Sequence, residues 1–171
     1  VVLITTKKGK AGEAKFTYTG SVAASRQSKR LDIMNLREFA EYYNNLANQG
    51  EISKPDPVYS DPSILGIGTN WQDAIFRTAM TTGHNISLSG KSNSVNYFVS
   101  GNYMKKEGTI IGSDFEKFGA RMNLSGQHKR LKFGVNFAPS YSVSNSVDAS
   151  GAGGIVQSAL MMPPTFPVYN A

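Results

Sequence analysis

The feature that most constrains this chain is an alternation of apolar with small polar side chains, sustained for about ten residues at a time. It is clearest at 95–104, where valine, tyrosine and glycine alternate with a set rich in asparagine and serine. Because successive side chains of a strand point to opposite faces, this pattern predicts a long strand with one apolar and one polar face. Strands of globular proteins usually run for about five or six residues, whereas about nine to eleven are needed to cross a membrane.

The composition of the polar face separates a membrane barrel from a soluble sheet. It consists mainly of Asn, Ser, Gly and Thr, whereas the wet face of a soluble sheet normally carries Lys, Glu and Arg. The one charge in the middle of an expected strand, Arg121, falls on the polar face. No stretch approaches the roughly 20 consecutive apolar residues of a membrane helix. The sequence therefore predicts an all-β fold, part of a transmembrane antiparallel β-barrel.

The lengths of the connections alternate as they do in such barrels. The connections at 90–94 and 127–130 are short, whereas those at 25–82, at 105–114 and beyond 144 are longer. Bacterial barrels have short periplasmic turns and longer extracellular loops. Aromatic residues of the apolar face then predict two girdles, with Tyr18, Tyr97 and Phe133 near the short turns and Tyr103, Phe118 and Tyr141 near the loops. The expected strands are about 15–25, 82–90, 93–106, 115–127 and 130–144.

Short helices are expected within the longer connections. Asn35 is a suitable N-cap for the first helix, and Glu38, three residues later, completes a capping box. Asn70 is a suitable N-cap for a second, shorter helix. A third is expected at 155–162, where two prolines follow and stop it.

A domain boundary is expected near the start of the chain. Residues 1–6 form a β-branched run apolar enough to be buried on both faces, and a basic, glycine-containing linker follows. We therefore assign 1–12 to the end of one domain and its linker, and 13–171 to the N-terminal part of the barrel. The chain starts at Val1 without a signal-peptide pattern and ends in a proline-rich run, so we expect it to be a piece of a longer protein.

No set of residues points to catalysis, to a metal site or to a cofactor. There is no cysteine, and His84 and His128 are the only histidines, so a thiolate or histidine metal cluster is not expected. The acidic residues are too scattered for a calcium loop or an acid–base pair. The net charge of +6 raises the hypothesis of a nucleic-acid binder, but the cations do not form one stripe interleaved with aromatics.

Alternation alone also fits a different kind of protein. In a soluble carbohydrate-binding or adhesin-like β domain, the apolar faces of the strands would form a buried core. The aromatic share of 11%, with many asparagines, would serve sugar binding as well as membrane girdles. This hypothesis and the barrel differ in whether the sheet folds in water without a membrane.

Several motifs follow one another along the chain in one order. They are 2–10 (VLITTKKGK), 70–79 (NWQDAIFRTA), 84–90 (HNISLSG), 96–103 (NYFVSGNY), 107–115 (EGTIIGSDF) and 163–169 (PPTFPVY). Each motif is weak by itself, but together and in this order the chain resembles the TonB-dependent outer-membrane transporters of the SusC/RagA type. The resemblance runs nearly from end to end.

The resemblance implies a fold and a function. Residues 1–12 would close a plug domain, and the remainder would supply the first strands of a barrel of roughly 22 strands. The implied activity is non-catalytic import of glycans, oligosaccharides or similar oligomers across the outer membrane of a Gram-negative bacterium. The implied partners are a SusD-type surface lipoprotein, the TonB energy-transducing complex acting through the preceding N-terminal part, an oligosaccharide or peptide ligand, and outer-membrane lipid, with no nucleic acid.

Candidate site residues follow from the faces of the expected strands. Trp71, in a long connection, is a candidate for contact with a ligand or a partner, or else an anchor that packs the connection. The candidates for lining the barrel lumen are Asn96, Ser100, Asn102, Arg121 and Asn123.

Overall fold

The computed structural model of the chain describes residues 14–53, 57–92, 94–149 and 151–169. The predicted plug end and linker, 1–12, lies outside the described residues. The chain divides into two compact units, which we call the sheet unit and the loop unit. Of the described residues, the sheet unit comprises those up to Ser25 together with those of Thr78–Gly108 and Gly112–Ser146. The loop unit comprises those of Arg26–Arg77, Thr109–Ile111 and from Val147 on. Among the described residues, no helix is long and apolar enough to cross a membrane.

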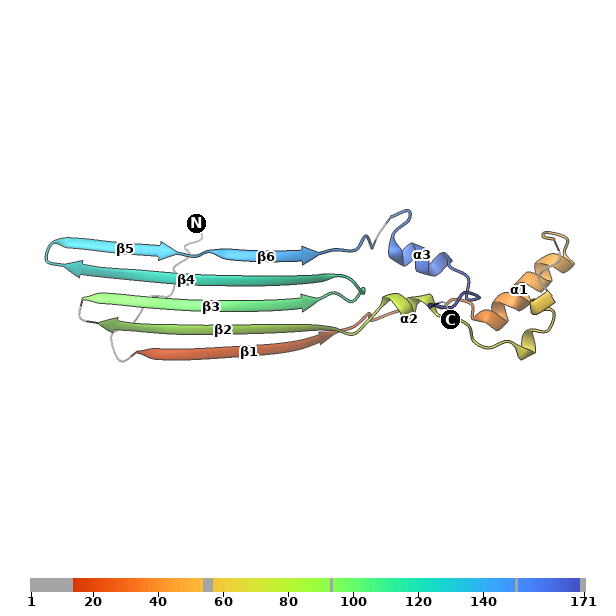
Figure 1. Cartoon of the computed structure of the whole chain (residues 1–171), viewed down its shortest axis with the longest axis horizontal. Coiled ribbons are helices and arrows are strands. Elements are labelled where there is room, and N and C mark those ends of the chain that lie inside the picture. Colours follow the sequence, from red (N-terminus) through yellow and green to blue (C-terminus); the bar gives the residue numbers. More distant parts are fainter. Residues whose placement is uncertain (1–13, 54–56, 93, 150, 170–171) are drawn as a thin grey trace. The chain divides into compact units, whose positions relative to one another are not determined.

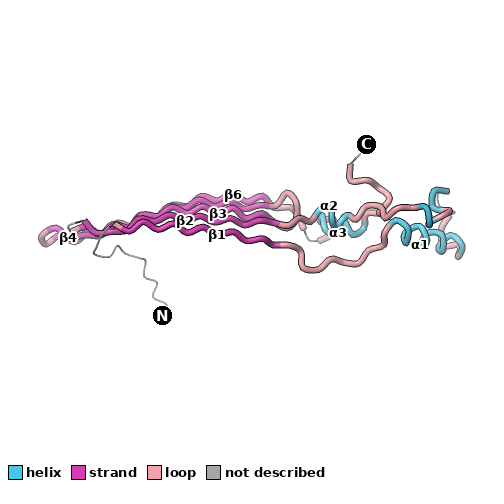
Figure 2. Tube along the Cα trace, turned by 90° about the horizontal axis from the view of Figure 1, so that it is seen from below, coloured by secondary structure: helices cyan, strands magenta, loops and turns pink. Residues whose placement is uncertain are grey.

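The sheet unit is one antiparallel sheet in which sequential strands are neighbours, in the order β1-β2-β3-β4-β5, with β6 also paired to β4. Figure 1 shows the strands side by side, and Figure 2 shows them as a single layer. This confirms the all-β antiparallel fold. The strands are β1 (Lys15–Ser25), β2 (Ala79–Ser92), β3 (Val95–Glu107), β4 (Asp114–His128), β5 (Leu131–Phe137) and β6 (Ser140–Asn145).

The segment expected to be one strand at 130–144 is two strands in the structure. β5 pairs with β4 up to Phe137 opposite Met122, and β6 pairs with β4 from Ser140 opposite Gly119, so one register continues across the gap. Pro139 lies in the gap and has no N–H to donate to the ladder. Its carbonyl still accepts a hydrogen bond from the amide of Ala120 at 3.0 Å. The interruption is therefore local, and the strand direction is kept.

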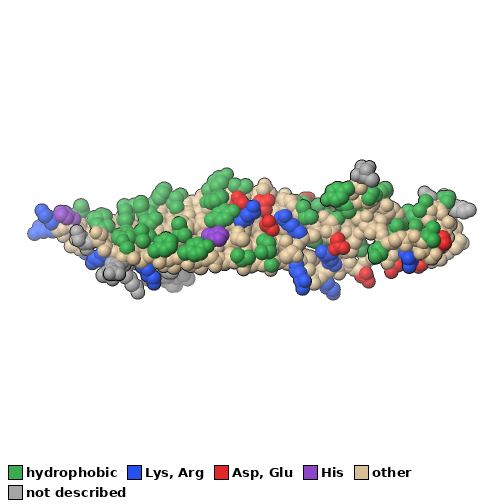
Figure 3. All heavy atoms as spheres, turned by 60° about the horizontal axis from the view of Figure 1, so that its bottom comes forward, with side chains coloured by type: hydrophobic (Ala, Val, Ile, Leu, Met, Phe, Trp, Pro, Cys, Tyr) green, Lys and Arg blue, Asp and Glu red, His purple; other side chains and the backbone are tan. Residues whose placement is uncertain are grey.

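The register places the alternating side chains of all the strands on two common faces. Directly paired residues share a face, and Leu88 pairs with Val99 while Ser87 pairs with Ser100. We call the face of Leu88 and Val99 the apolar face, and the face of Ser87 and Ser100 the polar face. Large side chains of the apolar face are exposed, with Phe16 67% and Leu131 68% accessible. Figure 3 shows hydrophobic side chains spread over the sheet, and no layer of the described residues buries the apolar face.

The loop unit contains the three predicted short helices, α1 (Leu36–Asn48), α2 (Trp71–Ile75) and α3 (Ile155–Met161). It also contains two 3₁₀ helices that were not predicted, η1 (Pro57–Tyr59) and η2 (Pro62–Ile64). The capping box at α1 is confirmed, since Asn35 Oδ1 accepts from the Glu38 amide and Glu38 Oε2 from the Asn35 amide, both at 3.0 Å. Asn70 caps α2 in the same way, with its Oδ1 accepting from the Gln72 amide at 3.0 Å.

Candidate functional site

The five predicted lumen-lining residues lie together on the polar face. Asn96, Ser100 and Asn102 belong to β3, and Arg121 and Asn123 to the adjacent β4. Ser100 pairs directly with Arg121 across the two strands. Alternation in the sequence assigns each residue to one face of its own strand. Only the register between β3 and β4 shows that the polar sides of the two strands lie on the same face of the sheet.

Side chains on the polar face pack closely against one another. Asn102 lies over Gly119 on the neighbouring strand, where a Cβ atom would come within 2.5 Å of the Asn102 Oδ1. A Cβ at Gly83 would come within 2.7 Å of the Ser21 Oγ. Asn123 is buried, with 8% of its surface accessible. Small polar side chains are therefore closely packed at these positions of the polar face.

Every charged side chain of the polar face is a cation in the strands that the structure describes. These residues are Lys15, Lys91, Lys106, Lys117, Arg121 and Lys132. Among these cations, the sequence singled out Arg121 alone as a candidate for lining the lumen, because the others lie near strand ends, where charged residues are usually solvated. The pairing of the strands shows that the other cations share the polar face with Arg121.

Charges on the apolar face are confined to the end of the strands away from the short turns. We call this the loop end, and the opposite end the short-turn end. Lys105 pairs with Glu116 there, with Nζ and Oε1 3.3 Å apart. Glu107 Oε2 accepts from the Met80 amide at 3.0 Å, and Asp114 Oδ1 accepts from the Asn145 amide group at 3.0 Å. The charges of this face are thus satisfied locally.

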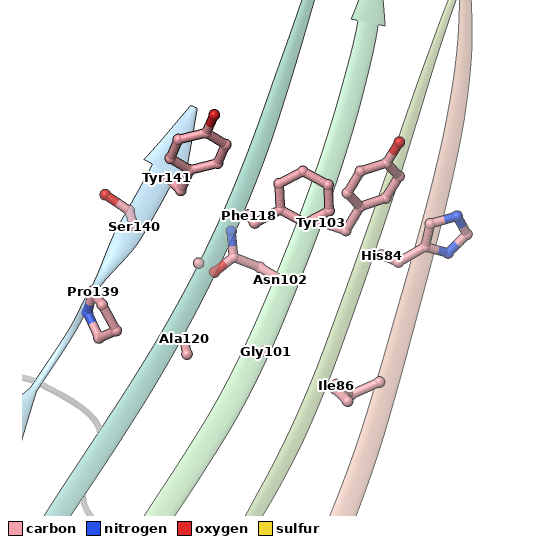
Figure 4. A pocket seen from close by; sticks show the side chains of 11 residues that line it. His84, Ile86, Gly101, Asn102, Tyr103, Phe118, Ala120, Pro139, Ser140 and Tyr141 are labelled. Atoms are coloured by element: carbon pink, nitrogen blue, oxygen red, sulfur yellow. The ribbon is translucent and has the colours of Figure 1, made fainter. Parts of the chain in front are cut away.

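An aromatic row crosses the apolar face just inside these charges. His84, Tyr103, Phe118 and Tyr141 are directly opposite one another on successive strands, and Figure 4 shows their rings side by side. Tyr18 lies beside the row, because its hydroxyl and the His84 Nδ1 are 2.8 Å apart. The prediction that Tyr18 belongs to the girdle near the short turns is therefore wrong, since the β1 register depends on pairing that alternation does not reveal.

The aromatic row borders a hollow in the apolar face. Its volume is about 540 Å³. The small residues Gly101 and Ala120 form its floor, with Ile86 and Pro139 beside them, as Figure 4 shows. The hollow arises because two adjacent strands carry small residues in the row between larger ones. Its lining is mainly apolar and suits a hydrocarbon surface.

The indole nitrogen of Trp71 makes a hydrogen bond within the loop unit. Its indole N–H donates to the Pro163 carbonyl at 3.0 Å. The neighbouring Gln72 is 3% exposed, and its amide group donates to the Leu31 carbonyl at 2.8 Å and accepts from the Leu31 amide at 3.0 Å. An ion pair also joins Arg30 and Asp73. These bonds give Trp71 the packing role considered above, and its contact with a ligand or partner stays a prediction.

Segments far apart in sequence meet in the loop unit, and no local motif signalled this. The Thr69 amide donates to the Pro164 carbonyl at 3.0 Å, and the Thr69 hydroxyl donates to the Phe166 carbonyl at 2.6 Å. The Leu36 amide donates to the Ile67 carbonyl at 2.8 Å. The long connections therefore have a defined internal structure, although they contain few helices.

Comparison with known proteins identifies the family. No family model matches the chain. TonB-dependent receptor SusC of Bacteroides thetaiotaomicron is 37% identical over 99% of the chain. TonB-dependent receptor P3 of Formosa agariphila is 28% identical over the whole chain. The chain belongs to the SusC/RagA-type TonB-dependent receptors.

The chain spans 16% of the SusC relative and 17% of the P3 relative. Solved structures agree with the sheet seen here. The RagAB peptide importer in its open-open state matches 92% of this SusC/RagA-type chain with a TM-score of 0.70 and 23% identity. Its closed-closed state matches 94% with a TM-score of 0.69 and 21% identity. The open antiparallel sheet is thus part of a β-barrel of the TonB-dependent receptor type.

Proposed function

We propose that this chain forms part of the wall of a TonB-dependent outer-membrane importer for oligosaccharides or similar oligomeric nutrients. The observation that carries the proposal is the two-faced sheet, whose apolar face is exposed among the described residues and whose polar face has small, closely packed groups. A barrel wall needs both faces, one against lipid and one against the lumen. A soluble sugar-binding domain would instead bury the apolar face in its own core.

The distribution of charge supports one orientation of the wall. On the apolar face, charged residues occur only beyond the aromatic row, as expected where strands emerge from the hydrocarbon into water. Tyr103 and Tyr97 lie six positions apart on β3, a span of about 20 Å at ~3.4 Å per residue. The short turns then face the periplasm, and the loop unit lies outside the cell. Residues 1–12 would end the plug, and the barrel would begin at 13.

The loop unit is suited to a protein partner. Its surface exposes large apolar side chains, including Ile64 and Ile67, each 77% accessible. Backbone contacts such as that from Thr69 to Pro164 fix its internal form, so little ordering would be needed on binding. We assign this surface to a SusD-type lipoprotein that captures ligand at the extracellular mouth. The TonB complex would act through the plug.

A peptide cargo is the second candidate. Its basis is the similarity in fold to the RagAB structures, which are described as a peptide importer. The polar face carries asparagine and serine groups that would hydrogen-bond either a sugar hydroxyl or a peptide amide. Both cargoes therefore agree with this part of the wall.

The test is uptake by cells that carry the intact receptor as their only transporter of this type. Depletion of an oligosaccharide mixture and of a peptide mixture would be followed by mass spectrometry, with and without TonB. We expect TonB-dependent depletion of the oligosaccharides. Depletion of peptides alone would replace the cargo class, and recovery of the intact receptor in the soluble fraction would contradict the proposal as a whole.

A further inference from the structure

Within the described strands, no carboxylate shares the polar face with its positive charges. The ion pair of Arg30 with Asp73 lies in the loop unit, and that of Lys105 with Glu116 lies on the apolar face. The acidic residues of the described strands, Glu107, Asp114 and Glu116, all belong to the apolar face by register. Every charged group of the polar face in the described strands is therefore a cation, and a carboxylate that pairs with these cations must come from another segment of the protein.

Two of these cations, Lys91 and Lys132, line a hollow at the short-turn end, and Lys129 lines it with them. The volume of the hollow is about 650 Å³. Two strands and a turn bring them together, since Lys91 is the last residue but one of β2, Lys132 is the second residue of β5 and Lys129 lies in the turn between β4 and β5. Lys129 has a φ of 52°, and its carbonyl accepts from the Gln127 Nε2 at 3.0 Å. The turn geometry thus holds one cation beside the other two.

Neutral hydrogen-bonding groups complete the lining of this hollow. Asn96, Ser125 and Gln127 lie on the polar face between the lysines, and Lys91 is directly opposite Asn96. Ammonium, amide and hydroxyl groups together are suited to carboxylate oxygens, which accept several hydrogen bonds at once. An ammonium is a compact point charge, so these lysines need no fixed planar geometry in the anion.

We propose that this hollow docks an acidic segment of the plug domain. The proposal rests on the proposed function, because a plug faces this surface only if the sheet is a barrel wall. Lys91 and Lys132 belong to the polar face, which excludes lipid phosphate outside the barrel as their partner. Cations enclosed between wall and plug lose water, at a cost that carboxylates opposite them offset. An anionic nutrient would neutralise them only during passage, whereas a plug carboxylate would do so continuously.

The experiment compares two double variants of the intact receptor, each of which removes two positive charges. Lys91→Gln/Lys132→Gln changes the hollow, and Arg26→Gln/Lys29→Gln changes exposed cations of the loop unit. The measurement is the rate of proteolytic cleavage of the plug in detergent, without ligand, while heat-modifiable gel migration reports that the barrel is folded. We expect about tenfold faster cleavage for the hollow variant, the equivalent of roughly 1.4 kcal/mol, and no change for the control.

Two further measurements keep the outcome decisive. Lys91→Arg/Lys132→Arg retains the charges and should keep the wild-type rate of cleavage. In the wild-type receptor, cleavage should accelerate steeply between about 0.05 and 0.5 M NaCl, because salt screens partly exposed ion pairs. This salt titration decides the question if the Gln variant does not assemble. Equal cleavage of the two Gln variants, or a rate insensitive to salt, would overturn the docking proposal.

Uptake separates the two proposals. Unchanged plug cleavage with normal TonB-dependent uptake would remove the docking proposal alone. The import proposal alone would be removed if the wild-type receptor took up no oligomer while the Lys91→Gln/Lys132→Gln variant still released its plug. A hollow variant with a firmly seated plug but weaker binding of acidic oligomers would assign the cations to the cargo instead.

Discussion

Gly68→Ala is the most informative substitution in the loop unit. Gly68 has a φ of +73°, and a Cβ there would come within 2.6 Å of the Pro164 carbonyl oxygen and 2.7 Å of the Leu36 Cβ. The positions on either side of Gly68 carry the contacts that close the unit, namely Ile67 to Leu36 and Thr69 to Pro164. A methyl group at this point would therefore separate segments that are distant in sequence.

The magnitude follows from two independent costs. A left-handed conformation costs a non-glycine residue about 1 kcal/mol, and forcing an extra carbon into a packed site costs about 1 to 3 kcal/mol. Gly50 has a φ of +74°, but nothing lies within 4 Å of its missing Cβ. Gly50→Ala therefore carries the first cost alone. We expect about 2 to 4 kcal/mol for Gly68→Ala and about 1 kcal/mol for Gly50→Ala.

Hydrogen exchange of the intact receptor measures this difference. The amides of Thr69 and Leu36 are bonded across the contact, so their exchange reports its opening. In Gly68→Ala they should exchange roughly 30-fold faster or more, at about tenfold per 1.4 kcal/mol. In Gly50→Ala they should exchange nearly as in the wild type. Equal acceleration in both variants would refute the packing argument and leave backbone strain as the whole effect.

Three other predictions concern single side chains. Gln72→Leu removes the partner of both backbone groups of Leu31 in a partly buried place, and should lower local stability by about 1 to 2 kcal/mol, measured by exchange of the Leu31 amide. The pKa of Asp61 is lowered from 3.8 by hydrogen bonds from Ser63, first from the hydroxyl and then from the backbone amide. The stability that ionised Asp61 contributes to the η2 turn is therefore present above pH ~4 and lost as the pH falls through the lowered pKa. A ¹³C titration should show the low pKa of Asp61 and a higher one in Ser63→Ala. Val99→Arg should cost about 2 to 4 kcal/mol on the lipid side and reduce the amount of assembled receptor on heat-modifiability gels.

The sequence predicted those features that depend on short-range patterns. Alternation assigned residues such as Val99 and Ser100 to opposite faces, and the capping box at Asn35 located the first helix. These signals succeed because strand and helix geometry fix where neighbouring side chains point. The family resemblance is also confirmed by the relatives.

The features that the sequence did not reveal depend on pairing between distant segments. The position of Tyr18 beside His84 depends on the register of β1 with β2, and the polar-face cations become one group only when all strands are aligned. Pro139 interrupts a strand whose register nevertheless continues. The contacts of Thr69 with Pro164 and Phe166 link residues more than ninety positions apart, and no local composition specifies such a contact.

The most direct test of the barrel assignment is the accessibility of spin labels in the intact receptor, reconstituted in lipid vesicles. Labels would be placed one at a time at Leu88 and Val99, a pair on the apolar face, and at Ser87 and Ser100, a pair on the polar face. The apolar-face labels should collide frequently with oxygen dissolved in the hydrocarbon, and the polar-face labels should not. Similar oxygen accessibility at all four positions, or high accessibility at Ser87 and Ser100 alone, would contradict the assignment of the apolar face to lipid.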